Sequence, residues 1–213
     1  AKTAANHTPL SPVSILKRVE RVHPNLPAQV HGSIRRNWGE VAARCKRLAS
    51  ALAKRGVSKG DTVALIAPNI PEALECALAV PMLGAVLNAN NMRLEANTLG
   101  YILEHGEASV LLVDTEFSAV AAEAVQLSGR DLLVIDIEDP EGPGGACIGA
   151  LTYEALLAEG SEDFAYTLPN DEWDALALNY TSGTTGHPKG VVYSTTSHQL
   201  LRHTASHKLS TTH

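Results

Sequence analysis

The stretch Asp61–Asn90, DTVALIAPNIPEALECALAVPMLGAVLNAN, predicts two strands with a helix between them. Residues 62–67 form a short, almost continuous apolar run, which is typical of a strand buried on both faces. A proline-containing break at 68–71 ends that strand and starts a helix, which Gly84 ends. The apolar residues 85–87 then favour a second strand, so strand, helix and strand follow one another in close succession.

The alternation of strands and helices extends over most of the chain. Helices are expected from Ser11-Pro12 to the residue before His23-Pro24 and over about 40–55, 72–83, 94–105, 117–127 and 151–159, and further strands over 109–113, 132–137 and 175–179. The Gly- and Pro-rich residues 138–149 are predicted to form an exposed loop. This pattern predicts an α/β fold with a mostly parallel sheet and helices on both faces.

The carboxyl ends of the strands are the expected place for a ligand in a sheet of this kind. Two acidic residues, Asp114 and Asp136, end predicted strands and could touch a ligand. A solvated carboxylate is the commoner situation at a strand end, and it is the preferred interpretation of both residues.

The composition of the 213 residues is that of a globular protein, with 45% hydrophobic and 19% charged residues. A net charge of −6 and the absence of long Lys/Arg runs argue against nucleic-acid binding. No window approaches the roughly 20 apolar residues needed to span a bilayer, and the first residues do not resemble a secretory signal. The cysteines Cys45, Cys76 and Cys147 are widely spaced, which predicts reduced thiols in a cytoplasmic protein rather than disulfides or a metal centre.

The segment Thr181–Gly190, TSGTTGHPKG, lies between two apolar runs, 175–178 and 191–193. Its three glycines allow a tight loop whose backbone N–H groups turn inward to hold an anion. Four hydroxyl residues donate hydrogen bonds without adding charge, and Lys189 adds one positive charge. These groups together suit a polyphosphate.

The loop differs from the Walker A pattern GxxxxGK[ST], because His187-Pro188 stands where Gly-Lys would follow Gly183, and Lys189 is followed by Gly190. The residues after the loop are typical of a strand rather than a helix, so the loop is predicted to join two strands as a mobile clamp. Most stretches rich in Gly, Ser and Thr are ordinary surface loops, and composition alone leaves that alternative open.

The run Thr-Ser-Gly-Thr-Thr-Gly-x-Pro-Lys-Gly at 181–190 resembles the signature loop of the acyl-adenylate-forming superfamily, the AMP-dependent synthetases and ligases. Further segments similar to this family are 8–12, 47–52, 60–64, 68–72, 80–88, 91–94, 101–105 and 171–174. The resemblance covers roughly residues 8–193. It is closest to fatty-acyl-CoA ligases of the short- and medium-chain branch, which includes methylmercaptopropionate-CoA ligases and plant acyl-activating enzymes.

The resemblance implies an enzyme in which a carboxylate attacks the α-phosphorus of ATP to give acyl-AMP, and coenzyme A then displaces AMP. The residues implied in binding the phosphates are Thr181, Ser182, Gly183, Thr184, Thr185, Gly186, Lys189 and Gly190. Among them, Lys189 and Thr184 are expected to serve catalysis, and Thr181 to lie beside Mg²⁺. The implied partners are ATP, coenzyme A and a carboxylic acid, and full-length relatives can form homodimers.

The resemblance divides the chain into a partial N-terminal AMP-binding domain, residues 1–193, and a divergent tail rich in Ser, Thr and His, residues 194–213. Full-length relatives are more than twice this long, so the chain is expected to be an N-terminal fragment with little ligase activity alone. The alternative is a non-catalytic truncated module that retains an ATP-phosphate-binding loop. The tail histidines have no acidic or cysteine partner nearby in the sequence, so a metal site there is not favoured.

Overall fold

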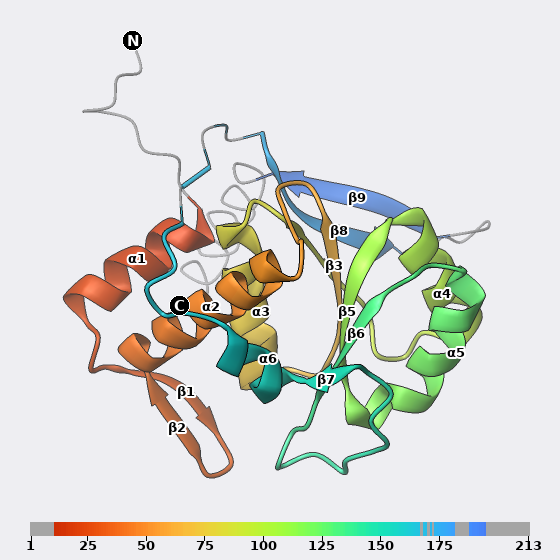
Figure 1. The fold of residues 1–213 in the computed structure, drawn as a ribbon, viewed down its shortest axis with the longest axis horizontal. Helices are drawn as coiled ribbons and strands as arrows, with labels where there is room; N and C mark the ends of the chain where they lie inside the picture. The colour runs from red at the N-terminus through yellow and green to blue at the C-terminus, as the bar shows by residue number, and fades with distance from the viewer. Residues whose placement is uncertain (1–10, 167, 170, 172, 182–187, 195–213) are drawn as a thin grey trace, which may run out of the picture.

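The computed structural model describes residues 11–166, 168–169, 171, 173–181 and 188–194, which form an α/β fold around one large sheet (Figure 1). The sheet has seven strands in the order β7-β6-β5-β3-β4-β8-β9. Their bounds are β3 Thr62–Ile66, β4 Val86–Ala89, β5 Ala108–Asp114, β6 Leu133–Ile137, β7 Leu151–Thr152, β8 Ala175–Thr181 and β9 Lys189–Ser194. All neighbouring strands are parallel except β8 and β9, so the predicted mostly parallel sheet is confirmed.

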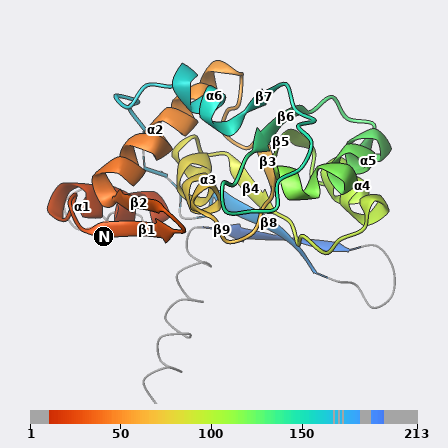
Figure 2. The same ribbon diagram turned by 90° about the horizontal axis from the view of Figure 1, so that it is seen from below.

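Helices cover both faces of this sheet, as Figures 1 and 2 show. One face carries α1 Pro12–Val22, α2 Trp38–Lys54, α3 Pro71–Met82 and α6 Tyr153–Glu159. The other face carries α4 Ala96–His105 and α5 Ser118–Ser128, with the short 3₁₀ helix η1 Thr115–Phe117 between β5 and α5. The prediction of helices on both faces is therefore confirmed.

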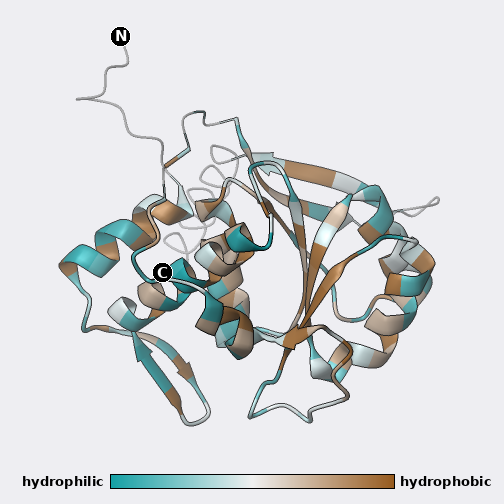
Figure 3. Cartoon of the chain, in the orientation of Figure 1, coloured by the Kyte–Doolittle hydropathy of each residue, from teal (hydrophilic) through white to brown (hydrophobic). Residues whose placement is uncertain are grey.

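The central strands are buried on both sides, which explains their continuous apolar sequence. In β3, Val63 and Leu65 belong to the core beneath α2 and α3, whereas Ala64 and Ile66 belong to the core beneath α4 and α5. Figure 3 shows the hydrophobic colouring concentrated along these strands. Burial on two faces removes the polar alternation that a half-exposed strand would show.

The helix ends follow from local signals in the sequence. The Ser11 hydroxyl accepts a hydrogen bond from the Ser14 N–H and starts α1, and Asn37 forms the same kind of capping box with Glu40 at the start of α2. After α3, Gly84 adopts a φ of +68°, a left-handed conformation that favours glycine. These signals explain why most predicted helix bounds agree with the structure to within two residues.

The sequence interpretation missed a hairpin of two short strands, β1 Pro27–His31 and β2 Ile34–Asn37. The side chain of β1 that lies buried is a glutamine, Gln29, so no apolar alternation marks this strand. Strand β7 was also missed, because it occupies the first two residues of the predicted helix 151–159. No helix in the described part of the chain is long and apolar enough to cross a bilayer.

Candidate functional site

Strands β8 and β9 form an antiparallel hairpin whose connection is the Gly-, Ser- and Thr-rich loop. The register pairs Thr181 with Lys189 and Tyr180 with Gly190, so three predicted site residues come together where the hairpin leaves the sheet. Thr181 and Lys189 are both exposed. The prediction that the loop joins two strands is confirmed, because β9 follows it directly.

The remaining predicted site residues, Ser182, Gly183, Thr184, Thr185 and Gly186, lie outside the described residues. The roles assigned to the loop residues stay predictions. The geometry of the hairpin fixes only the two ends of the loop and the sheet edge from which it emerges.

The loop leaves the sheet on the side where the parallel strands have their carboxyl-terminal ends. Strand β8 is parallel to β4, so Thr181 lies at the same sheet edge as the carboxyl ends of β3 and β4. Ligands in open α/β sheets bind at this edge. The loop therefore begins where the fold favours a binding site.

A buried asparagine ties β8 to its neighbour. Asn88, on β4, has no exposed surface, and its Nδ2 donates to the Leu178 carbonyl at 2.7 Å. Asn90 supports it by donating from Nδ2 to the Asn88 Oδ1 at 2.9 Å. The ladder between these strands has one registered pair, Leu87 with Ala177, so the side chain of Asn88 extends the connection beyond it.

The base of the loop also contacts α4. The Tyr180 hydroxyl and the His105 Nδ1 are 2.7 Å apart, and the two rings meet edge to face with centroids 5.8 Å apart. Burial raises the pKa of the Tyr180 hydroxyl, so it stays protonated near neutral pH. At Gly190 an added Cβ would lie 3.4 Å from the Tyr180 ring, which shows how closely β9 approaches that side chain.

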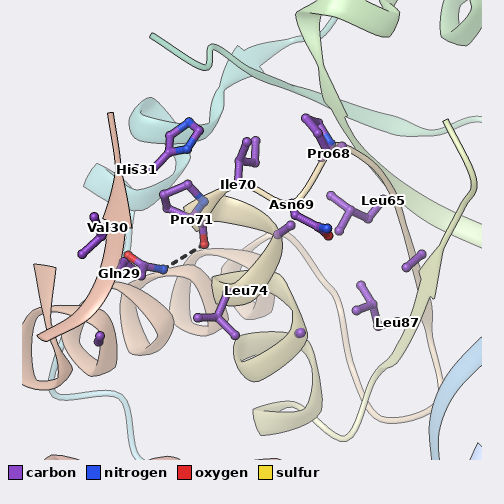
Figure 4. A pocket seen from close by; sticks show the side chains of 15 residues that line it. Gln29, Val30, His31, Leu65, Pro68, Asn69, Ile70, Pro71, Leu74 and Leu87 are labelled. Carbon is purple, nitrogen blue, oxygen red and sulfur yellow. Dashed lines mark hydrogen bonds between the residues drawn. The ribbon is translucent and has the colours of Figure 1, made fainter. Parts of the chain in front are cut away.

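A cavity of about 520 Å³ lies between β1, the start of α3 and the ends of β3 and β4 (Figure 4). Its wall is mostly apolar, and its polar side chains are Gln29, His31 and Asn69. Gln29 donates from Nε2 to the Pro71 carbonyl at 3.0 Å, and the His31 Nε2 lies 2.9 Å from the Asp139 Oδ1. The volume is within the usual range of small-ligand pockets, and no sequence pattern indicated this cavity.

A network of charged side chains, centred on the buried Glu75, lies behind the same part of α3. Glu75 has no exposed surface; its Oε1 accepts from Arg36 at 3.0 Å and Arg44 at 2.8 Å, and its Oε2 accepts from the Tyr153 hydroxyl at 2.8 Å. Arg44 also pairs with Glu154 at 2.6 Å and lowers the pKa of that carboxyl. Because these charges are paired with one another, the network joins β2, α2, α3 and α6 and has a structural role.

The interpretation of Asp114 and Asp136 as solvated strand ends is wrong, since they are 2% and 1% exposed. The Asp114 Oδ1 accepts from the Glu116 N–H at 2.9 Å, and Asp136 accepts from the N–H groups of Ile148 and Gly149 at 3.1 and 2.8 Å. Both carboxylates thus hold the chain that leaves their strands, because they satisfy backbone donors there.

The three cysteines differ in their burial. Cys45 and Cys76 are buried in the core, Cys147 is exposed, and all three are free. Burial raises the pKa of the Cys45 and Cys76 thiols, which keeps them protonated and poorly nucleophilic. Within the described residues, no group of three or more His, Cys, Asp or Glu is placed to hold a metal ion.

Comparison with known families identifies the fold and the loop together. The family described as AMP-binding enzyme matches residues 16–212. This chain belongs to the AMP-binding enzyme family. The match includes the whole of the β8–β9 hairpin and its loop, so the resemblance seen in the sequence is confirmed.

The relatives of this AMP-binding enzyme chain include named CoA ligases. It is 45% identical over 203 residues to "Acetate/butyrate--CoA ligase AAE7, peroxisomal" of Arabidopsis thaliana, covering 90% of this chain and 36% of the relative. It is 41% identical over 217 residues to "Acetate--CoA ligase CCL3" of Humulus lupulus, covering 96% of this chain and 38% of the relative. The chain therefore spans little more than a third of the length of these curated relatives.

The solved structures show the same architecture. The anthranilate CoA ligase AuaEII, determined in complex with anthranoyl-AMP, superposes with a TM-score of 0.79 at 25% identity, over 91% of this chain and 36% of that one. A Mycobacterium tuberculosis fatty acyl CoA synthetase superposes with a TM-score of 0.69 at 26% identity, over 87% of this chain and 34% of that one. The predicted α/β fold of the adenylate-forming enzymes is confirmed.

Proposed function

We propose that this chain is the phosphate-binding part of an ATP-dependent acid–thiol ligase, which activates a carboxylic acid as acyl-AMP and transfers the acyl group to coenzyme A. The observation that carries the proposal is the β8–β9 hairpin, which brings Thr181 and Lys189 together at the carboxyl edge of the parallel strands. The relatives named as CoA ligases supply the reaction class. The complete reaction belongs to a protein of their length.

In the first half-reaction the loop would bind the β- and γ-phosphates of ATP and the departing pyrophosphate. Lys189 supplies the positive charge, and Thr184 and the other hydroxyl and N–H groups of the loop supply hydrogen bonds to phosphate oxygens. Little covalent chemistry falls to the protein, because positioning and charge stabilisation carry most of phosphoryl-group reactions.

Magnesium is part of the proposal as a companion of ATP. Mg²⁺ prefers oxygen ligands, keeps several waters and is commonly held by substrate phosphates with few protein groups. Thr181, an exposed residue at the end of β8, would be one of the few protein groups beside the ion. When bound, the ion would neutralise phosphate charge beside Lys189.

The substrate class proposed is a short- or medium-chain carboxylic acid, which would place the protein in fatty-acid metabolism. Relatives are named for acetate, butyrate and 2-methylpropanoate. We also propose a cytoplasmic location and a homodimer for the complete enzyme. Because several relatives are named as peroxisomal, fractionation of cells that carry a tagged protein is the measurement that decides the location.

The proposal is tested by pyrophosphate release with ATP, Mg²⁺ and a panel of short and medium carboxylic acids. Two proteins are compared, namely this chain and the complete reading frame that contains it. We expect turnover in the longer protein and little in this chain, with Lys189→Ala and Thr184→Ala each lowering kcat/KM by about 10²-fold or more.

The matched control is Lys17→Ala, which removes an exposed lysine on α1. It should leave turnover unchanged. Binding of ATP without turnover in either protein would instead support the non-catalytic module. Absence of both ATP binding and turnover would contradict the proposed function.

A further inference from the structure

Tyr180 immediately precedes Thr181, the first residue of the proposed phosphate loop. Its hydroxyl lies 2.7 Å from the Nδ1 of His105, the last residue of α4. His105 in turn packs against Tyr101, one helical turn earlier, with ring centroids 5.2 Å apart. A side chain at the base of the loop thus has a specific partner on a helix 75 residues away in sequence.

The end of β8 has little backbone pairing on the side of β4. The ladder between β4 and β8 has one registered pair, at Ala177, and beyond it β8 continues to Thr181 beside the edge strand β9. In addition to the ladder with β9, two side-chain hydrogen bonds among the described residues reach this extension: one from Asn88 to the carbonyl of Leu178, and one between His105 and the hydroxyl of Tyr180.

The end of α4 is shaped to come close to β8. The helix ends at His105, and at the next residue, Gly106, an added Cβ would lie 2.9 Å from the Ile102 carbonyl oxygen, 3.2 Å from the Leu178 side chain and 3.3 Å from the Tyr180 hydroxyl. The contact with the Ile102 carbonyl is closer than real Cβ atoms show, so a larger residue would disturb the end of the helix beside β8. Gly106 is therefore packed closely against β8, and the hydrogen bond between His105 and Tyr180 lies beside this contact at an exposed position.

We propose that His105 and Tyr180 form a clamp that positions the phosphate loop, with both acting as positioning residues rather than catalytic ones. The clamp fixes the direction of β8 where it ends at Thr181. Because Thr181 pairs with Lys189 in the β8–β9 ladder, the clamp also fixes the start of β9. This inference rests on the proposed function, because the loop's ligand is taken to be the ATP polyphosphate. The contact itself is independent of what the loop binds.

The clamp is tested first by hydrogen exchange of this chain at the backbone amides of 178–181 and 189–191. Asn places an amide group near the position of the His Nδ1, whereas Gln places it farther out and Phe offers none. We expect His105→Phe, His105→Gln and Tyr180→Phe to speed exchange there by about fivefold, the factor that one ordinary hydrogen bond is worth, and His105→Asn to stay near wild type.

The double variant with His105→Phe and Tyr180→Phe should be no worse than either single variant, because both remove one shared bond. Equal behaviour of the Asn and Gln variants would overturn the clamp, since a packing role does not distinguish them. Unchanged exchange in Tyr180→Phe would overturn it as well.

The second arm measures pyrophosphate release in the complete reading frame. We expect His105→Phe and Tyr180→Phe to raise the KM for ATP by about three- to tenfold with the KM for the acid unchanged, and His105→Asn to restore it. If the wild type itself neither binds nor turns over ATP, the proposed function fails and the exchange arm alone decides the clamp. Faster exchange with an unchanged KM for ATP would show that the contact does not position the loop.

Discussion

Removing the Tyr153 hydroxyl should destabilise the fold through the buried charge network. The side chain is 2% exposed, and its hydroxyl donates to the Oε2 of Glu75, which is fully buried. Tyr153→Phe keeps the ring, including its contact with Arg44 at 5.9 Å from the guanidinium carbon to the ring centroid, and leaves the Glu75 Oε2 without its donor.

A hydrogen bond to a charged group contributes about 1.5–3 kcal/mol, so we expect a loss of about 2 kcal/mol in the free energy of unfolding. With a urea m-value of about 2 kcal/mol/M, the midpoint should fall by about 1 M. The assay is urea unfolding followed by circular dichroism at neutral pH, and the m-value should not change.

The control is Tyr166→Phe, the same chemical change at a half-buried tyrosine whose hydroxyl has no hydrogen-bond partner in the described part of the chain. Its midpoint should move by less than about 0.25 M, which corresponds to about 0.5 kcal/mol. A shift equally small in Tyr153→Phe would refute the view that this network stabilises the packing of α6 against α2 and α3.

Two further predictions concern neighbouring parts of the molecule. Burial raises the pKa of Glu72 above its ordinary value of 4.5, so the folded protein loses stability as the pH rises through that raised pKa and Glu72 becomes charged. Glu72→Gln should therefore increase the urea midpoint more at pH 7 than at pH 4. An equal increase at both pH values would contradict this prediction. At Gly160 an added Cβ would lie 1.9 Å from the Arg47 carbonyl oxygen, so Gly160→Ala should lower the free energy of unfolding by about 1–3 kcal/mol. Gly142→Ala, whose nearest contact would be 3.4 Å, should change it by less than about 0.5 kcal/mol, and equal losses at the two sites would refute the clash.

The sequence predicted those elements whose signal is local. The strand at 62–66 is recognisable because burial on both faces makes every residue after Thr62 apolar, and the helix after it because Pro71 and Gly84 mark its ends. The hairpin at 27–37 was missed because its buried residue, Gln29, is polar and is stabilised by a carbonyl 42 residues away. Local patterns carry no information about such a partner.

The same distinction applies to the candidate site. The loop was recognised because its glycines, hydroxyl groups and lysine are contiguous from Thr181 to Gly190. The contacts that hold the base of the loop were not, because Asn88 and Leu178 are 90 residues apart and His105 and Tyr180 are 75 apart. The burial of Asp114 and Asp136 was also missed. An acidic residue at a strand end is usually solvated, and its sequence context does not show that backbone N–H groups will donate hydrogen bonds to its carboxylate.

The place of the β8–β9 hairpin in the strand order has a consequence for how the protein folds. Strands β3 to β6 lie within residues 62–137, whereas β8 must return from residue 175 to lie beside β4. Closing so long a segment costs chain entropy before any contact repays it, so the hairpin is expected to join the sheet after its centre has formed. During synthesis, β4 and α4 are made well before β8, so the β8–β9 hairpin docks on a surface of β4 and α4 that has already formed.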